Sequence, residues 1–197
     1  GFAFIELCRK RYDVIVMNPP FGSCLKKNFD WQKKTYPESF IDLLSVFVDR
    51  GIQMSIGSVG AITSRNLLVI PKLKRFRESK FIPKLNLLLD LGWPVMDDAT
   101  VHSAAYILND QNNSDNIIAI NRKPYKNKEE NLLSAINTLI DKDLYRIEKS
   151  SLLKLPESRI LYQLPKELIS LFNTNIKFKT RLTEAKQGLK PMDDFRF

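Results

Sequence analysis

The chain has 197 residues, with 31 Lys and Arg against 22 Asp and Glu and a formal net charge of +9. A composition of 44% hydrophobic and 27% charged residues supports a folded core and excludes disordered, collagen-like and coiled-coil classes. No apolar run reaches the ~20 residues that cross a bilayer, and the first residues lack the layout of a secretory signal. We expect a soluble, cytoplasmic protein of one domain, or one domain with an appendage.

The numbers of cysteine, histidine and glycine residues exclude several kinds of site. Two cysteines, Cys8 and Cys24, and one histidine, His102, are too few for a disulfide framework or a usual zinc site. We interpret Cys8 and His102 as structural. None of the seven glycines forms a Gly-x-Gly-x-x-Gly or Gly-x4-Gly-Lys loop, so no recognisable nucleotide-cradling motif is present. The basic excess points to nucleic acid as a partner.

The first strong element is residues 12–17, whose apolar, β-branched run predicts a fully buried strand of the parallel kind. The prolines of Asn18-Pro19-Pro20-Phe21 end it. Residues 23–37 are a polar stretch. Residues 38–54 repeat apolar side chains at helical spacing and predict a helix with a core-facing stripe over 40–48. Residues 60–64 predict a second short strand.

The next part of the chain predicts three more strands. Residues 67–81 predict a loop and helix with a basic face, and residues 84–91 a third strand. Residues 104–108 and 116–120 predict a fourth and a fifth strand, arranged as a hairpin-like pair. This order predicts an α/β fold, a parallel sheet that finishes with an antiparallel strand.

The character of the chain changes after Asn121. Residues 122–130 are charged and predict a linker, followed by helices over 132–140 and 165–172, a weak strand over 145–147, and a basic, turn-rich end. We therefore expect two parts: a first domain over residues 1–122 and a mixed helical extension over residues 123–197.

Asn18-Pro19-Pro20-Phe21 is the segment with the clearest chemistry. In open α/β sheets, ligands bind at the carboxyl ends of the strands, where this segment lies. An asparagine oxygen and a neighbouring carbonyl can accept both hydrogens of an exocyclic amino group, and Phe21 can stack on the heterocycle that carries it. These parts suit a base lifted out of a duplex. The alternative is that Asn18-Pro19-Pro20-Phe21 has no function beyond forming a turn after a buried strand.

Asp13-Val-Ile-Val-Met-Asn-Pro-Pro-Phe-Gly22 resembles motif IV of the amino-group DNA methyltransferases, where Asn-Pro-Pro-Phe or Asn-Pro-Pro-Tyr marks N6-adenine enzymes. Residues 47–51 and 57–65 are similar to the helix and strand that follow it in the γ arrangement. Residues 88–92 and 98–108 resemble its later motifs. Residues 185–197 resemble the junction to the target-recognition domain of large single-chain restriction-modification and phage-defence methyltransferases.

The resemblance implies the second half of a Rossmann-like methyltransferase sheet that transfers a methyl group from S-adenosylmethionine to adenine N6 of double-stranded DNA. Asn18 and the carbonyl of Pro19 would accept the amino hydrogens of a flipped adenine, Phe21 would stack on it, and Pro20 would lie near the cofactor. No metal is implied. The family's second stacking residue would correspond here to Met96 or Trp93.

The family's donor-binding Phe-x-Gly-x-Gly loop precedes motif IV and is not found in this sequence. The resemblance therefore implies that the chain is part of a longer enzyme, is inactive in isolation, and uses S-adenosylmethionine only in the full-length parent. It does not imply an oligomeric state.

Two basic groups are candidate DNA contacts. The first lies in the stretch after the motif and the second follows the 60–64 strand: Lys26, Lys27, Lys33 and Lys34, then Lys72, Lys74, Arg75 and Arg77. The alternative for the first group is an ordinary solvated loop, and a cluster such as the second is more often a solvated helix face.

Two alternatives to DNA methylation stay open. A non-catalytic α/β module for nucleic-acid binding or assembly could carry the same motif. RNA and protein-glutamine methyltransferases also use Asn-Pro-Pro-Phe or Asn-Pro-Pro-Tyr, so the preference for DNA depends on the later motifs.

Overall fold

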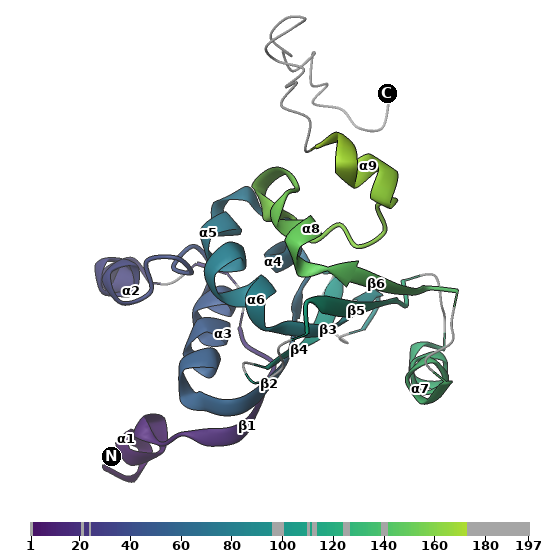
Figure 1. Ribbon diagram of the computed structural model, residues 1–197. Helices are drawn as coiled ribbons and strands as arrows, with labels where there is room; N and C mark the ends of the chain where they lie inside the picture. Colours follow the sequence, from purple (N-terminus) through teal and green to yellow (C-terminus); the bar gives the residue numbers. More distant parts are fainter. Residues whose placement is uncertain are drawn as a thin grey trace, which may run out of the picture.

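The structure is a computed structural model. It describes residues 2–20, 22–23, 25–95, 101–109, 111, 114–123, 127–138 and 142–172, and all statements below concern these residues. They form one mixed sheet with helices packed against it (Figure 1).

Helices separate most of the strands along the chain, but the third, fourth and fifth strands follow one another directly among the described elements. The strands are β1 (Tyr12–Met17), β2 (Ser55–Ser64), β3 (Leu85–Gly92), β4 (Ser103–Asn109), β5 (Asn116–Asn121) and β6 (Leu144–Glu148). The α-helices are α1 (Phe2–Arg9), α2 (Phe29–Thr35), α3 (Leu43–Met54), α4 (Asn66–Val69), α5 (Lys74–Phe76), α6 (Ile82–Lys84), α7 (Lys128–Thr138), α8 (Lys149–Leu153) and α9 (Lys166–Leu171). Tighter or wider turns are η1 (Lys26–Asn28), η2 (Pro71–Leu73), η4 (Pro156–Ser158) and the π-helical η3 (Arg77–Phe81).

The sheet has the strand order β1-β2-β4-β3-β5-β6. Strands β1 and β2 are parallel, as are β3 and β5, while β4 lies antiparallel between β2 and β3 and β6 is antiparallel at the edge. The α/β sheet with parallel and antiparallel strands is confirmed. The hairpin of residues 104–108 and 116–120 is wrong: β4 pairs along both its edges with β2 and β3, which leaves β5 to pair with the far edge of β3.

The core lies between this sheet and the helices on one of its faces. Its centre combines α3 and the turns before β3 with the inward residues of the central strands. The largest buried members are Leu44, Leu67, Leu68, Phe76, Phe81, Ile82, Leu85, Leu88 and Tyr106. The Phe81 and Tyr106 rings meet edge to face, with centroids 4.8 Å apart. The stripe expected over residues 40–48 is core at Leu44 and Val48, whereas Phe47 is 46% exposed.

Strand β1 is not fully buried, contrary to the expectation. It pairs only with β2 among the described residues, and Val14 and Val16 are 63% and 81% exposed. Ile15 and Met17, on the opposite face, pack against the core. The β-branched run correctly indicates a strand, but the run alone does not reveal that no described helix covers its second face.

Several elements differ from their expected form. The stretch 23–37 contains η1 and α2, and the helix expected from residue 38 begins at Leu43, because Asp42 caps it. The loop and helix expected over residues 67–81 is present with later bounds: short turns occupy residues 66–73, and residues 74–84 then run helically through α5, the π-helical η3 and α6. Helix α1 is not predicted by the sequence pattern. The helices expected over 132–140 and 165–172 and the strand over 145–147 are confirmed as α7, α9 and β6, with small shifts at the ends.

The segment after residue 142 joins the same sheet and core. Strand β6 pairs with β5, and Leu152, Leu155, Ile160 and Tyr162 belong to the core cluster. The side chain of Arg77 ties this segment to the helical turns: its guanidinium donates to the carbonyls of Leu67, Ile70, Glu157 and Ser158 at 2.7–3.0 Å. The division into parts at residues 122 and 123 stays a prediction about the longer protein.

Replacing Arg77 should be costly. We expect Arg77→Met to lower the free energy of unfolding by about 3 kcal/mol, because four carbonyls lose their donor in a buried site. Urea unfolding measures the loss. The matched control is Arg75→Met two residues earlier, where the exposed side chain predicts a change within about 0.5 kcal/mol. Equal stability of the two variants would contradict the structural role of Arg77.

Candidate active site and nucleic-acid interface

The carboxyl ends of the parallel strands meet at one edge of the sheet. Met17 is in register with Ala61 of β2, and Ser64 of β2 and Gly92 of β3 both pair with Ser103 of β4. Asn18 therefore leaves the sheet at the same edge as the ends of β2 and β3. This is the edge where open α/β sheets bind ligands.

The motif residues occupy this edge in an alternating pattern of exposure. Asn18 and Pro20 are exposed and Pro19 is buried. Pro19 therefore anchors the turn, while the residues on either side of it are accessible to solvent. Phe21 lies outside the described residues, so its stacking role stays a prediction.

The end of the motif is fixed to the first turn of α3. Gly22 has φ +110°, a conformation that favours glycine, and its N–H donates to Asp42 Oδ1 at 2.9 Å. The same oxygen caps α3 by accepting the N–H of Leu44 at 3.1 Å, and the N–H of Leu43 donates to the Gly22 carbonyl at 2.9 Å. These bonds set the direction in which the chain leaves Pro20.

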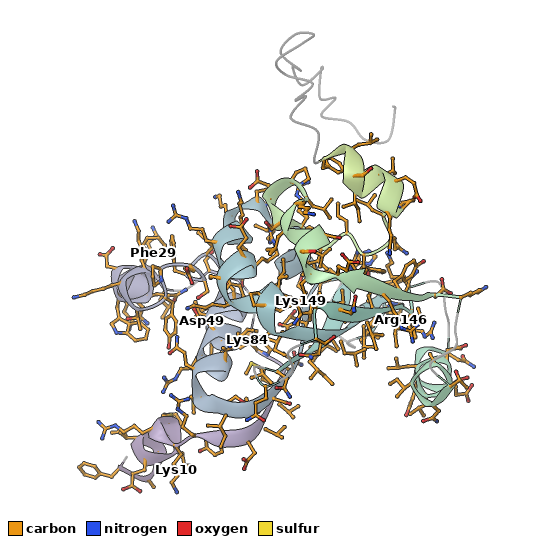
Figure 2. The ribbon with its side chains drawn as sticks, viewed as in Figure 1. Lys10, Phe29, Asp49, Lys84, Arg146 and Lys149 are labelled. Carbon is orange, nitrogen blue, oxygen red and sulfur yellow. The ribbon has the colours of Figure 1, made fainter. Side chains whose placement is uncertain are left out.

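A buried carboxylate fixes the segment just before α3. Asp49 on α3 is fully buried, accepts the hydroxyl of Ser39 at 2.7 Å and pairs with Lys80 Nζ at 2.8 Å. Lys80 also lies 3.5 Å from Glu38. Figure 2 labels Asp49 on α3, and this pair connects that helix to η3. The loop between α2 and α3 is thereby held against the helical turns.

A second buried carboxylate lies at the carboxyl end of β3 and was missed by the sequence analysis. Asp90 is fully buried and lies 2.8 Å from Arg65 Nε and 3.4 Å from Lys123 Nζ, and it accepts the Tyr162 hydroxyl at 2.7 Å. It joins the ends of β2, β3 and β5 to the segment after α8. An acidic residue inside the apolar run 87–91 is the signal that could have identified it.

Burial changes the acidity of two tyrosines in this region. Desolvation raises the pKa of the Tyr162 phenol, and its hydrogen bond to Asp90 and the charge of that carboxylate raise it further. Desolvation also raises the pKa of the fully buried Tyr106 phenol. Both phenols are therefore neutral in the folded protein well beyond pH 10.

The expected DNA-contacting residues divide into exposed and buried ones. Seven of the eight are exposed: Lys26, Lys27, Lys33 and Lys34 around α2, and Lys72, Lys74 and Arg75 on η2 and α5. Lys74 lies 3.8 Å from Glu78, and Lys33 Nζ lies 5.8 Å from the centroid of the Phe40 ring. The assignment of Arg77 is wrong: its side chain is fully buried and its donors bind backbone carbonyls, so it cannot reach a phosphate.

Only some of the remaining candidate residues lie within the described part of the chain. Trp93 follows β3 and is 54% exposed, whereas Met96 and residues 185–197 lie outside the described residues. The His102 carbonyl accepts the N–H of Arg65 at 2.8 Å, which is a structural contact. Among the described residues, no group of three His, Cys, Asp or Glu side chains could hold a metal ion. Within the same residues, no helix is long and apolar enough to cross a membrane.

Solved structures define the fold class. The chain is similar to a type I restriction-modification methyltransferase subunit from Streptococcus thermophilus, with TM-score 0.56, 11% identity, and 74% of this chain and 36% of that chain covered. It is similar to a putative class I S-adenosylmethionine-dependent methyltransferase from Listeria monocytogenes, with TM-score 0.50, 13% identity and coverages of 67% and 44%. It is also similar to DrdV, solved in complex with DNA, with TM-score 0.55, 15% identity and coverages of 83% and 19%. The fold is therefore that of S-adenosylmethionine-dependent methyltransferases.

A match to a protein-family model is more specific than the likeness to solved structures. Residues 2–92 match the model described as Eco57I restriction-modification methylase, which confirms the resemblance found in the sequence over this part of the chain. No protein of curated function matches the sequence. The chain spans 19–44% of the length of the three structures named above. The γ arrangement and the N6-adenine class stay predictions.

The Asp42 cap gives the second testable change. We expect Asp42→Ala to lower the free energy of unfolding by about 1–2 kcal/mol, because one carboxylate oxygen serves both the α3 cap and Gly22. Asp42→Asn keeps an amide oxygen that can cap and should lose less. Urea unfolding checks both, with exposed Asp30→Ala as the matched control. A loss in Asp42→Ala no greater than in the control would exclude this function of the cap.

The buried tyrosines predict a dependence of stability on alkaline pH. Their folded pKa values lie above the unfolded value of ~10, so stability is complete below about pH 10 and falls as the pH rises further, by up to ~1.4 kcal/mol per pH unit for each phenol. Urea unfolding between about pH 8 and pH 11 measures this slope. Tyr162→Phe should make the decline shallower. An unchanged slope in that variant would show that Tyr162 does not contribute.

Proposed function

We propose that this chain forms the motif-IV half of an N6-adenine DNA methyltransferase of a restriction-modification or phage-defence system. The observation that carries the proposal is the position of Asn18-Pro19-Pro20, with an exposed asparagine followed by a buried proline at the carboxyl edge of a methyltransferase-type sheet. The family match over residues 2–92 supports methyl transfer within restriction-modification as the general activity.

The roles of the motif residues follow from their chemistry. The exocyclic amino group of adenine has two hydrogens, and Asn18 Oδ1 and the Pro19 carbonyl each supply one acceptor. Accepting both hydrogens would concentrate lone-pair density on N6, which would form a bond to the donor's methyl carbon as the sulfur–carbon bond breaks and the sulfur keeps the electron pair, without a covalent enzyme intermediate. One of the two N6 protons held by Asn18 Oδ1 and the Pro19 carbonyl would then pass to solvent. Phe21 would stack on the base, whose removal from the duplex is otherwise unfavourable.

The cofactor would be S-adenosylmethionine, which supplies an electrophilic methyl group when bound. Among the described residues, Pro20 would lie nearest to this group, and it is exposed beside Asn18 at the carboxyl edge of the sheet. No glycine-rich cradle occurs in the sequence, so we infer that the loop that binds the donor comes from another part of the full-length enzyme.

Double-stranded DNA is the proposed substrate. The exposed lysines Lys26, Lys27, Lys33 and Lys34 follow the motif directly, and Lys72, Lys74 and Arg75 follow the end of β2. Cations at these positions can contact phosphates without reading sequence, which suits a catalytic half whose target is read elsewhere. The solved complex of DrdV with DNA is consistent with this assignment.

Replacing Asn18 tests the central residue of the proposal. In the full gene product, Asn18→Ala should abolish formation of N6-methyladenine in DNA amplified by polymerase, because the N6 amino group loses an acceptor. Amplified genomic DNA contains unmethylated recognition sites, so the target sequence need not be known. The readout is mass spectrometry of digested nucleosides after incubation with S-adenosylmethionine.

Two comparisons make this experiment decisive. Asn127→Ala, an exposed asparagine before α7, is the matched control and should methylate normally. Full turnover by Asn18→Ala would refute the role of this residue. If the unaltered protein methylates no adenine yet still binds DNA, the non-catalytic binding module becomes the better description. Methylated RNA or protein glutamine would instead reassign the substrate.

A further inference from the structure

A hollow lies between α2 and α3, directly after the motif. Its volume is about 510 Å³, within the range of small-ligand sites. Ser23, three residues after Pro20, lies in its wall. The other lining residues are mostly apolar or aromatic, and Trp31, Tyr36 and Phe47 are the largest.

Three large apolar side chains that line this hollow are substantially exposed to solvent. Leu25 is 65% exposed, Trp31 62% and Phe47 46%. Exposed apolar clusters rimmed by polar residues mark binding sites in soluble proteins. Helix α2, which Figure 2 locates by Phe29, projects from the body beside α3, so that this surface is accessible.

The indole of Trp31 is held in place by its neighbours. It meets the Tyr36 ring edge to face, with centroids 6.0 Å apart, and Tyr36 is only 7% exposed. The Tyr36 N–H donates to the Gln32 carbonyl at 2.8 Å, and buried Gln32 donates through Nε2 to the Phe40 carbonyl at 2.9 Å. An anchored aromatic ring with most of its surface in solvent can act as a stacking platform.

The charge around the hollow selects its occupant. Arg50 lies in the wall of the hollow, and four exposed lysines lie on η1 and on α2, the helix that carries Trp31: Lys26, Lys27, Lys33 and Lys34. Asp30 is the only acidic residue within η1 and α2. An apolar platform with one cation in its wall and four exposed lysines on the same short segment complements a nucleobase and its phosphates better than an apolar protein segment.

We propose that this hollow is a second base-binding site, which holds an unstacked nucleobase of the DNA against Trp31 while the four lysines contact the adjoining phosphates. The site is separate from the pocket for the target adenine at Asn18. It depends on the proposed function only in taking DNA as the ligand.

Tryptophan fluorescence tests this site in the 197-residue chain. The chain has two tryptophans, so Trp93→Phe leaves Trp31 as the sole reporter. An oligodeoxyadenylate of about ten nucleotides, within the length that single-stranded DNA grooves cover, should quench Trp31 emission. An abasic oligonucleotide of equal length and charge should bind more weakly and leave the emission unchanged.

Substitutions then separate stacking from charge. In the otherwise unaltered chain, Trp31→Ala should weaken oligodeoxyadenylate binding by roughly 5- to 150-fold, as expected for one lost base stack. Trp31→Phe should retain most of the affinity and guards against misfolding as the cause. Phe172→Ala removes an aromatic side chain that is also half exposed but lies just after α9, and should leave affinity unchanged.

Each alternative result overturns the inference. Equal affinity and quenching with the abasic oligonucleotide would mean that the hollow takes no base, and unchanged affinity in Trp31→Ala would mean the same. Emission that varies with protein concentration alone would assign the hollow to a second copy of the chain. The proposed function is tested separately: Asn18→Ala should retain Trp31 quenching while it loses methylation, and methylation by the full gene product without quenching would remove only the second site.

Discussion

One carboxylate oxygen of Asp42 fixes the end of the Asn18-Pro19-Pro20 segment relative to helix α3. Asp42 Oδ1 accepts N–H groups from both Gly22 and Leu44, so the end of the motif and the start of α3 share one acceptor. Residues 23–41 are therefore an insertion whose two ends lie next to each other. We call this insertion the excursion. Because closing a loop costs free energy that grows slowly with its length, this excursion can carry α2 and its lysines without disturbing the geometry of Asn18.

Two buried charged side chains hold the other side of the site. The carboxylate of Asp90 contacts two cations, Arg65 and Lys123, and the phenol of Tyr162. The guanidinium of Arg77 binds backbone carbonyls from two distant segments. Both groups attach the segment after β6 to the ends of the central strands. The carboxyl edge of the sheet is thus rigid on its central strands, while the excursion after β1 presents the exposed polar groups.

Much of this arrangement could be predicted from the sequence, and the failures have identifiable causes. The apolar runs indicate β1 to β5 because each is short and continuous and is followed by turn residues, and Asn18-Pro19-Pro20 predicts a turn at a sheet edge. Pairing could not be read from periodicity, so the insertion of β4 between β2 and β3 was missed. A run of cations does not show which ones are solvated, which is why Arg77 was grouped with exposed neighbours such as Arg75. The hollow beside Trp31 requires α2 and α3 to pack together, which only tertiary structure reveals.

The exposed face of β1 has a practical consequence for handling the protein. Val14 and Val16 point into solvent from a strand that has only one described neighbour. Such an edge can accept a strand from another molecule, since its unpaired backbone groups and β-branched side chains suit pairing. Concentrated solutions of this chain will therefore favour edge-to-edge association, and a lysine at position 14 or 16 is the substitution of choice for keeping it dispersed.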